Sequence, residues 1–267
     1  MNPSPGSLAH TAGASDSSRF NRLPTHRINV AFRPAFGLRS RVVRLVLFDI
    51  DGTLIRTGGA GVKAFGRAFA SEFNIPNGTE RLSFSGRTDT GLARQLFIQH
   101  GLDPSPENFR RFFDSYVFWL DHMLSRTNGA VCPGVWEFVR QLHALPDPPL
   151  FGLLTGNIRL GAEIKLRHFE LWEVFQTGAF ADDHEDRNQI AAIAHRRAGL
   201  LLKGALRGDE VLVIGDTALD IQCARHVGAR ILAVATGGAD WEELAPHRPD
   251  LLVKDLTQVT AEQVVCG

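Results

Sequence analysis

The sequence of 267 residues lacks features that would place it in several specialised classes. No apolar run approaches the roughly 18 residues that a membrane-spanning helix needs, which argues against a membrane protein. The only cysteines are Cys132, Cys223 and Cys266, widely spaced and without a CxxC pair. They indicate neither a disulfide framework nor a zinc site, and they favour a reducing compartment, so we expect a cytoplasmic protein.

The sequence also lacks a net charge, because 29 basic and 29 acidic residues cancel. Residues 1–44 hold seven arginines and a single acid, Asp16, so the remainder holds 22 basic and 28 acidic residues. A folded part with net negative charge argues against general nucleic-acid binding. A hydrophobic content of 44% with 22% charged residues is that of an ordinary globular protein. The length fits one large α/β domain or a core with an insertion.

Four short apolar runs follow residue 44, and each ends in polar or glycine residues. The runs are 45–48, 150–154, 211–214 and 230–234, and helical patterns lie between the later ones at 159–169, 188–198 and 218–227. Runs this short, apolar on both faces, are typical of buried parallel strands. The alternation of strand and helix predicts an α/β fold with a Rossmann-like, three-layer core around a parallel sheet.

The first two runs are separated by about 100 residues without a strand signal. Aromatic residues recur at the spacing of one helix face over 109–123, after Ser105 and Pro106, which fit an N-cap and a first helical position. Two more helices are expected, over 92–99 with Asp89 as cap, and over 62–73. This insertion resembles a lid over the carboxyl edge of the sheet.

The predicted domains follow from these patterns. Residues 1–40 have no periodic apolar face and are expected to form a disordered or weakly structured leader. The leader is rich in Arg and Ser, like an organelle transit peptide, so import into an organelle is one alternative if the host is eukaryotic. A variable extension and a start codon placed too far upstream are the others. Residues 41–57 and 146–267 should form the catalytic core, and residues 58–145 an all-helical cap.

Polar residues stand at the ends of three predicted strands. Ligands of open parallel α/β sheets bind outside the carboxyl ends of the strands. One rim should therefore gather Asp49, Asp51, Thr155, Asn157, Asp216 and Asp220. A single strand-end aspartate often only caps a helix or starts a turn. Three carboxylates brought together form a hard, oxygen-rich pocket of the kind that Mg²⁺ prefers.

These residues carry a resemblance to a known family. The segments Asp49-Ile-Asp51-Gly-Thr-Leu54, Leu153-Leu-Thr155-Gly-Asn157 and Gly215-Asp216-Thr-Ala-Leu-Asp220 resemble the first, second and fourth motifs of the haloacid dehalogenase-like (HAD) superfamily. They occur in the correct order, within residues 45–235. The set is similar to the phosphoglycolate phosphatase-like branch. Gly58-Gly-Ala-Gly61 looks like the flap after the first motif, and Cys132-Pro-Gly134 like the return from a helical cap.

The resemblance implies a Mg²⁺-dependent phosphatase that hydrolyses a small, phosphoglycolate-like phosphate monoester through an aspartyl-phosphate. In this interpretation Asp49 is the nucleophile, and Asp51 is the general acid and then the base. Mg²⁺ would be held by Asp49, the main-chain carbonyl of Asp51, and Asp216. The residues expected at the phosphoryl group or the flap are Gly52, Thr155, Gly156 and Asn157. Thr53 and Asp220 are expected to orient the groups that contact the substrate or the metal.

Phosphoryl transfer to a carboxylate requires cations. A carboxylate 4 Å from a phosphate dianion is repelled by about 8 kcal/mol at an effective dielectric constant of about 20. The family usually offers a lysine at its third motif, but this chain has none between Lys165 and Lys203. We expect Arg187, which directly precedes the helix at 188–198, to take this role. Lys203 lies beyond that helix, and Lys165 about two turns inside the helix that follows Thr155.

Arg87 is a further candidate, for the distal group of the substrate. It precedes a helix N-terminus, which is a natural anion site, although a plain surface arginine fits as well. The partner we expect is a small phosphorylated metabolite, with no nucleic acid and no membrane, and the oligomeric state is not readable from the sequence.

Rival functions within the family differ in the residues that they require. Asp51 disfavours a dehalogenase or a phosphonatase, because phosphate-ester chemistry needs an acid there. The alternatives kept are a HAD-type phosphosugar mutase and a non-catalytic HAD-fold binding protein. The first usually has a histidine shortly after the first motif, and none occurs between Asp51 and His100. A non-catalytic binding protein would be favoured by the loss of a motif aspartate, yet all four are present: Asp49, Asp51, Asp216 and Asp220.

Overall fold

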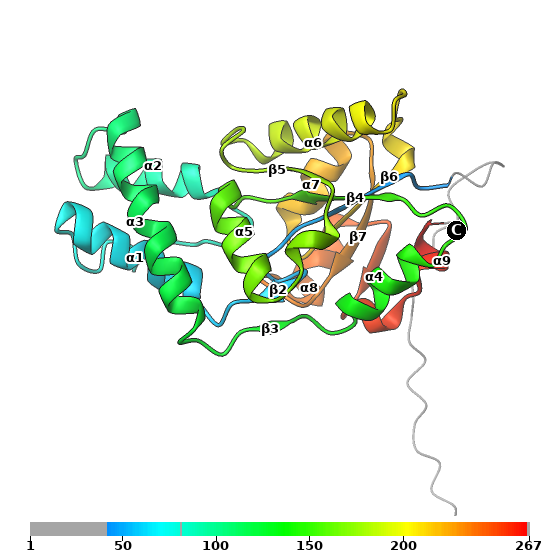
Figure 1. The fold of residues 1–267 in the computed structure, drawn as a ribbon, viewed down its shortest axis with the longest axis horizontal. Helices are drawn as coiled ribbons and strands as arrows, with labels where there is room; N and C mark the ends of the chain where they lie inside the picture. The colour runs from blue at the N-terminus through cyan, green and yellow to red at the C-terminus, as the bar shows by residue number, and fades with distance from the viewer. Residues whose placement is uncertain (1–41, 81, 266–267) are drawn as a thin grey trace, which may run out of the picture.

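The computed structural model describes residues 42–80 and 82–265. The predicted leader, with its transit-peptide alternative, and Cys266 lie outside the described residues. Six strands form one parallel sheet in the order β5-β4-β1-β6-β7-β8 (Figure 1). They are β1 (Leu45–Phe48), β4 (Leu150–Leu154), β5 (Thr177–Ala179), β6 (Val211–Gly215), β7 (Arg230–Val234) and β8 (Leu251–Val253). The predicted parallel sheet is confirmed, with β5 and β8 added at its two edges.

The sheet is buried on both faces, because alternate side chains of each strand enter different apolar clusters. In β1, Val46 and Phe48 belong to the first cluster, whereas Leu45 and Leu47 belong to the second. Helices α4 (Val135–His143), α5 (Arg159–His168) and α9 (Ala261–Val265) contribute to the first cluster, and α6 (Arg187–Leu201), α7 (Ala218–His226) and α8 (Trp241–Leu244) to the second. This arrangement confirms the predicted three-layer core. Short 3₁₀ helices lie at Trp172–Val174, Gly208–Glu210, Ala245–His247 and Leu256–Gln258.

Three helices form a separate group at one end of the molecule: α1 (Ala60–Phe73), α2 (Asp89–Gln99) and α3 (Pro106–Leu124) (Figure 1). Ser105 caps α3 by accepting a hydrogen bond from the Asn108 backbone, and Pro106 is its first residue, as the sequence predicts. The aromatic stripe of α3 packs against α1 and α2 to form a third cluster. Its most buried rings are Phe65, Phe69, Phe97, Phe112 and Tyr116.

Two details differ from the sequence-based picture. One short strand lies within the predicted insertion: β3 (Ala130–Val131) pairs antiparallel with β2 (Ile55–Arg56), which lies just before the insertion. Strands of two residues carry no periodic signal, so the pattern could not reveal them. Helix α4, assigned to the cap on the sequence, buries Phe138 and Leu142 in the first cluster, beside the sheet. An apolar stripe shows that a helix is half-buried but not which partner it packs on.

The described part of the chain contains no helix that combines the length and the apolar character needed to cross a membrane.

Truncation of the aromatic cap cluster should destabilise the protein. The Phe112 ring is fully buried and meets the rings of Phe65, Phe69 and Phe97. We expect Phe112→Ala to lower the free energy of unfolding by about 3–5 kcal/mol, through lost burial and the cavity left behind. Phe118→Ala is the matched control, because Phe118 lies on the same helix and is 67% exposed. Urea unfolding that finds equal stabilities for the two variants would contradict this packing.

Candidate active site

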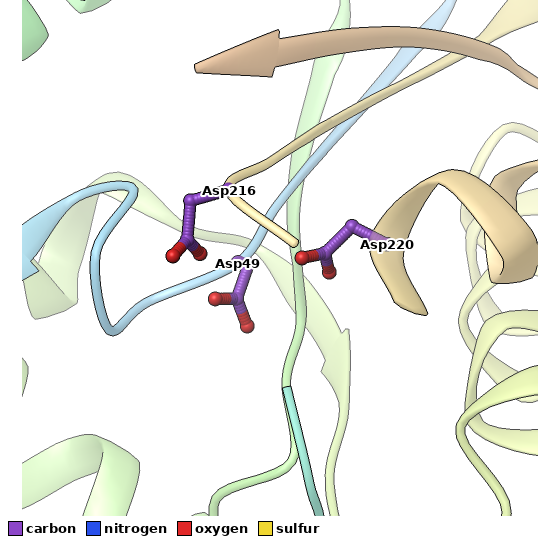
Figure 2. Close-up of side chains that lie close together, drawn as sticks. All are labelled: Asp49, Asp216 and Asp220. Atoms are coloured by element: carbon purple, nitrogen blue, oxygen red, sulfur yellow. The ribbon is translucent and has the colours of Figure 1, made fainter. Parts of the chain in front are cut away.

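The carboxyl edge of the sheet gathers three buried aspartates. Asp49 directly follows β1 and donates its backbone N–H to Ile214 of β6, so it lies beside the residue that follows that strand, Asp216. Asp220 comes from the first turn of α7. One carboxylate oxygen from each lies within 4.8 Å of the others, and Figure 2 shows the three side chains converging.

Crowding and burial perturb these acids. Burial raises the pKa of Asp49 to about 7, Arg187 opposes the rise, and Asp220 and Asp51 add to it. Burial, together with the charges of Asp49 and Asp220, raises the pKa of Asp216 well above its ordinary value. Carboxylates that resist ionisation together are stabilised by a cation placed between them. The hard oxygen donors of this cluster therefore suit a divalent metal ion.

Arg187 is the cation that the structure places at the cluster. It is the first residue of α6 and is only 8% exposed. Its Nη2 donates to Asp49 Oδ1 at 2.7 Å and to Asp220 Oδ1 at 2.5 Å. Burial disfavours the charge, yet the carboxylates of Asp220 and Asp49 keep the pKa of Arg187 above its ordinary value. Arg187 thus lies where the sequence places it, next to the expected nucleophile.

The remaining oxygens of the cluster are unequally available. Asp220 Oδ2 accepts hydrogen bonds from the backbone and the hydroxyl of Thr217, in a capping box at the start of α7. Asp216 accepts from the Gly238 backbone at 2.6 Å and from the Thr53 hydroxyl at 3.3 Å. Asp49 Oδ2 accepts no hydrogen bond from residues 42–80 or 82–265. Both oxygens of Asp216 and both of Asp220 accept hydrogen bonds, but Asp220 Oδ1 binds the guanidinium of Arg187, whereas Asp216 meets only neutral donors. A metal ion therefore fits Asp49 and Asp216 better than Asp220.

A second hydrogen-bonded group follows β4. Thr155 is fully buried, and its Oγ1 accepts from the Asn157 backbone at 3.3 Å and from Asn157 Nδ2 at 2.7 Å. Asn157 Nδ2 also donates to Asp51 Oδ2 at 2.8 Å, and Lys165 Nζ donates to the same oxygen at 2.7 Å. The amide of Asn157 is thereby occupied by its neighbours and links the loop to Asp51.

Lys165 also reaches the site, although the sequence predicts no role for it there. It lies about two turns inside α5, and its ammonium group contacts Asp51 and Asn157. Side chains of a helix lean toward its N-terminus, and the side chains of Asp51 and Asn157 extend to meet the lysine ammonium. Lys203 behaves as expected, since it is exposed beyond the end of α6, away from the cluster.

Two glycines allow the close approaches in the site. Gly52 has a φ of 87°, and its backbone N–H donates to Ile55 at 2.8 Å. A Cβ at Gly52 would clash with the carboxylate of Asp216. Gly156 packs directly against the Arg87 backbone, where a Cβ would also clash. Both positions therefore need glycine because another backbone or a carboxylate lies against them.

The cap helix α2 docks on the core at this point. Its N-cap is Thr88, which accepts from Gly91, rather than Asp89 as the sequence suggests. Asp89 instead uses its carboxylate to accept from the Ile158 backbone at 2.9 Å, and its own N–H donates to Gly156 at 2.7 Å. A threonine and an aspartate in succession both suit an N-cap, so the sequence alone does not decide between them.

The cap and the core enclose a cavity of about 420 Å³, a suitable size for a small metabolite. Its core side is polar, with Asp49, Asp51, Thr155, Lys165, Arg187 and Asp216. The cap side adds apolar walls from Val62, Phe65, Phe84, Leu92 and Tyr116. Arg87 also lines the cavity, half-buried, and its guanidinium makes no hydrogen bond or ion pair with the part of the chain that the structure describes.

Comparison with known proteins identifies the class to which this fold and site belong. The model of the family described as haloacid dehalogenase-like hydrolase matches residues 46–234, more than half of the chain. The chain belongs to this family. The match confirms the family expected from the sequence and spans the site residues from Asp49 to Asp220.

Curated relatives are similar in sequence over most of their length. The phosphoglycolate phosphatase of Photorhabdus laumondii is 22% identical over 81% of this chain and 91% of its own. The pyrophosphatase PpaX of Anoxybacillus flavithermus is 23% identical over 81% of this chain and 95% of its own. These names agree with the class of enzyme expected from the sequence, a HAD-type phosphoric monoester hydrolase.

Solved structures share the fold. CbbY from Rhodobacter sphaeroides in complex with phosphate superposes with a TM-score of 0.64 at 20% identity, covering 81% of this chain and 96% of CbbY. The β-phosphoglucomutase of Clostridium difficile superposes with a TM-score of 0.65 at 16% identity, covering 83% of this chain and 95% of the mutase. At these identities the likeness shows a common fold.

The buried carboxylate of Asp89 should make stability depend on pH. Burial raises its pKa from 3.8 to about 7, against the lowering effects of Lys165 and the Ile158 N–H. The folded state therefore holds the Asp89 proton more tightly than the unfolded state, and the stability that this provides is lost as the pH rises through 7. Asparagine keeps an oxygen for Ile158 but does not titrate.

We expect the melting temperature of Asp89→Asn, relative to wild type, to rise by several degrees between pH 5 and pH 8. For a protein of this size, 1 kcal/mol corresponds to about 2–4 °C. Asp103→Asn, at an exposed carboxylate of the cap, is the control and should show a difference that does not depend on pH. A constant difference between Asp89→Asn and wild type across this range would show that Asp89 does not titrate there.

Proposed function

We propose that the protein is a Mg²⁺-dependent phosphatase that hydrolyses a small, phosphoglycolate-like phosphate monoester through an aspartyl-phosphate on Asp49. One observation carries the proposal: the carboxylate of Asp49 is buried beside Asp216 and is held at 2.7 Å by the guanidinium of Arg187, in the wall of a metabolite-sized cavity. This is the combination of nucleophile and cation that attack on a phosphate dianion requires.

The nucleophile is held at one oxygen. Arg187 binds Asp49 through Oδ1, while Oδ2 is left without a partner from the described residues. The guanidinium charge offsets part of the repulsion of about 8 kcal/mol between a carboxylate and a phosphate dianion at 4 Å. Asp220 accepts a second hydrogen bond from the same Nη2 and so helps to hold Arg187 in place. The pair therefore supports attack by Asp49 on phosphorus.

The side chains of Asp49 and Asp216 and the main-chain carbonyl of Asp51 would hold the metal ion. When bound, Mg²⁺ supplies positive charge to the transferring phosphoryl oxygens and to the crowded carboxylates. Thr53 donates to Asp216 and so orients its carboxylate. Asp220 supports Arg187 instead of binding the metal.

Proton transfer is assigned to Asp51, whose side chain lines the cavity and is 43% exposed. It protonates the leaving oxygen as the ester bond breaks, and it then accepts a proton from the water that hydrolyses the aspartyl-phosphate. The Thr155 hydroxyl accepts two hydrogen bonds from Asn157, so its own hydrogen is free to bind a phosphoryl oxygen.

The distal end of the substrate is assigned to the cap. Arg87 is a half-buried cation in the cavity wall without a partner among the described residues, which suits a carboxylate or a second anion on the substrate. No histidine occurs among the described residues that line the cavity, so nothing there favours the mutase alternative. A cytoplasmic location remains a prediction, and the comparisons lend no support to organelle import.

The proposed function predicts that Asp49→Asn folds normally and loses at least about 10³ in kcat, because an amide does not attack phosphorus. Phosphate release is measured over a panel of metabolite phosphates, with Mg²⁺ and with a chelator. Wild type should be active only with the metal, and Asp114→Asn, at an exposed site on α3, should match it. Near-normal turnover by Asp49→Asn would overturn the nucleophile. An inactive wild type across the panel would favour a non-catalytic binding protein.

A further inference from the structure

Lys165 is a buried lysine whose role the assignments above leave open. The residue is 4% exposed, and its ammonium group lies at the inner wall of the cavity. A buried lysine is rare because its charge loses hydration, so it needs compensating partners. Its hydrogen-bond partners are Asp51 Oδ2 at 2.7 Å and Asn157 Oδ1 at 2.6 Å.

Neutralisation of Asp51 does not explain this arrangement, although the charge of Lys165 also opposes the rise in the pKa of the buried Asp89. The side chain of Asp51 is 43% exposed, so water can solvate its charge without help from a lysine. The asymmetry between the two partners, one buried and one half-exposed, indicates that the lysine acts on the orientation of the carboxylate. Two donors, Lys165 Nζ and Asn157 Nδ2, converge on one oxygen, Oδ2.

The second carboxylate oxygen of Asp51, Oδ1, is available for proton transfer. Asp51 Oδ1 accepts no hydrogen bond from residues 42–80 or 82–265. When Asp51 is protonated, the hydrogen must reside on Oδ1, because Oδ2 already faces two donors. The two hydrogen bonds thus fix both the rotamer of Asp51 and the oxygen that carries the proton.

We propose that Lys165 is a positioning residue, which with Asn157 holds Asp51 by Oδ2 so that Oδ1 faces the reacting oxygens. This inference rests on the proposed phosphatase function. As Asp49 bonds to phosphorus and the ester bond breaks, the Oδ1 proton moves to the leaving oxygen. In the second step, water gives a proton to Oδ1 as its oxygen bonds to phosphorus and the Asp49–phosphorus bond breaks.

The role can be tested by the dependence of the rate on the leaving group. Hydrolysis of p-nitrophenyl phosphate expels a stable phenolate that needs little protonation, whereas phosphoglycolate expels an alkoxide that does. We expect Lys165→Met to lower the ratio of kcat/KM for phosphoglycolate to that for p-nitrophenyl phosphate at least about tenfold, since general acid catalysis contributes about 10²–10⁴. The loss should appear in kcat, with KM for phosphoglycolate almost unchanged. The ratio does not depend on the fraction of folded enzyme.

Two comparisons separate positioning from packing. Lys203→Met removes an exposed lysine and should leave the ratio at its wild-type value. Asp51→Asn should lower the ratio, and adding Lys165→Met to it should lower the ratio no further, because the lysine acts through that carboxylate.

An unchanged ratio in Lys165→Met, or a further fall in the double variant, would overturn the role of Lys165 while leaving the phosphatase intact. A wild-type protein that hydrolyses neither ester in the presence of Mg²⁺ would overturn the proposed function and this role with it.

Discussion

The buried guanidinium of Arg187, held between Asp49 and Asp220, is the interaction on which the site depends. Removal of one partner from such a group typically costs about 3–5 kcal/mol, because a charge is left buried without compensation. When ionised, the carboxylates of Asp49, Asp216 and Asp220 carry three negative charges against the single positive charge of Arg187. The remaining charge of −2 is the amount that one divalent cation neutralises, which gives the metal proposal an electrostatic basis independent of the family.

The rest of the fold keeps these charges together and shields them from water. Parallel pairing aligns Phe48 of β1 with Leu153 of β4 and Ile214 of β6, so the residues after these strands meet at one edge. Glycine at position 52 lets the backbone lie against the carboxylate of Asp216. The cap then closes the edge through α2, where Asp89 binds the backbone that leads into α5. A second ion pair, between Lys165 and Asp51, lies on the same wall of the cavity.

The sequence was most informative where the chemistry depends on residues at the ends of strands. Short apolar runs ending in Asp49, Thr155 and Asp216 were sufficient to predict the sheet and the shared rim, because parallel strands point their carboxyl ends to one side. Arg187 was also found, since it precedes a helix whose N-terminus should face that rim. These are local signals, readable within a few residues.

The features that the sequence did not predict depend on the reach of a long side chain and on contacts between segments far apart in the chain. Lys165 enters the site because its long side chain leans toward the start of α5 and meets the side chains of Asp51 and Asn157, which the spacing in the sequence does not reveal. The choice of Thr88 over Asp89 as N-cap depends on the Ile158 backbone, which offers Asp89 another partner across the cap–core contact. Helix α4 packs beside the sheet although it continues from the insertion, because its apolar stripe fits either partner.

The central claim is that Arg187 supplies the cation of the third motif. The most direct measurement is kcat/KM, at saturating Mg²⁺, for Arg187→Ala and Arg187→Lys on the best substrate. The account predicts a loss of about 3–5 kcal/mol of transition-state stabilisation for alanine and partial recovery for lysine, which returns the charge without the planar fork. Arg197→Ala, on the same helix and paired with Asp183 outside the cavity, should remain close to wild type. Normal turnover by Arg187→Ala would contradict the account.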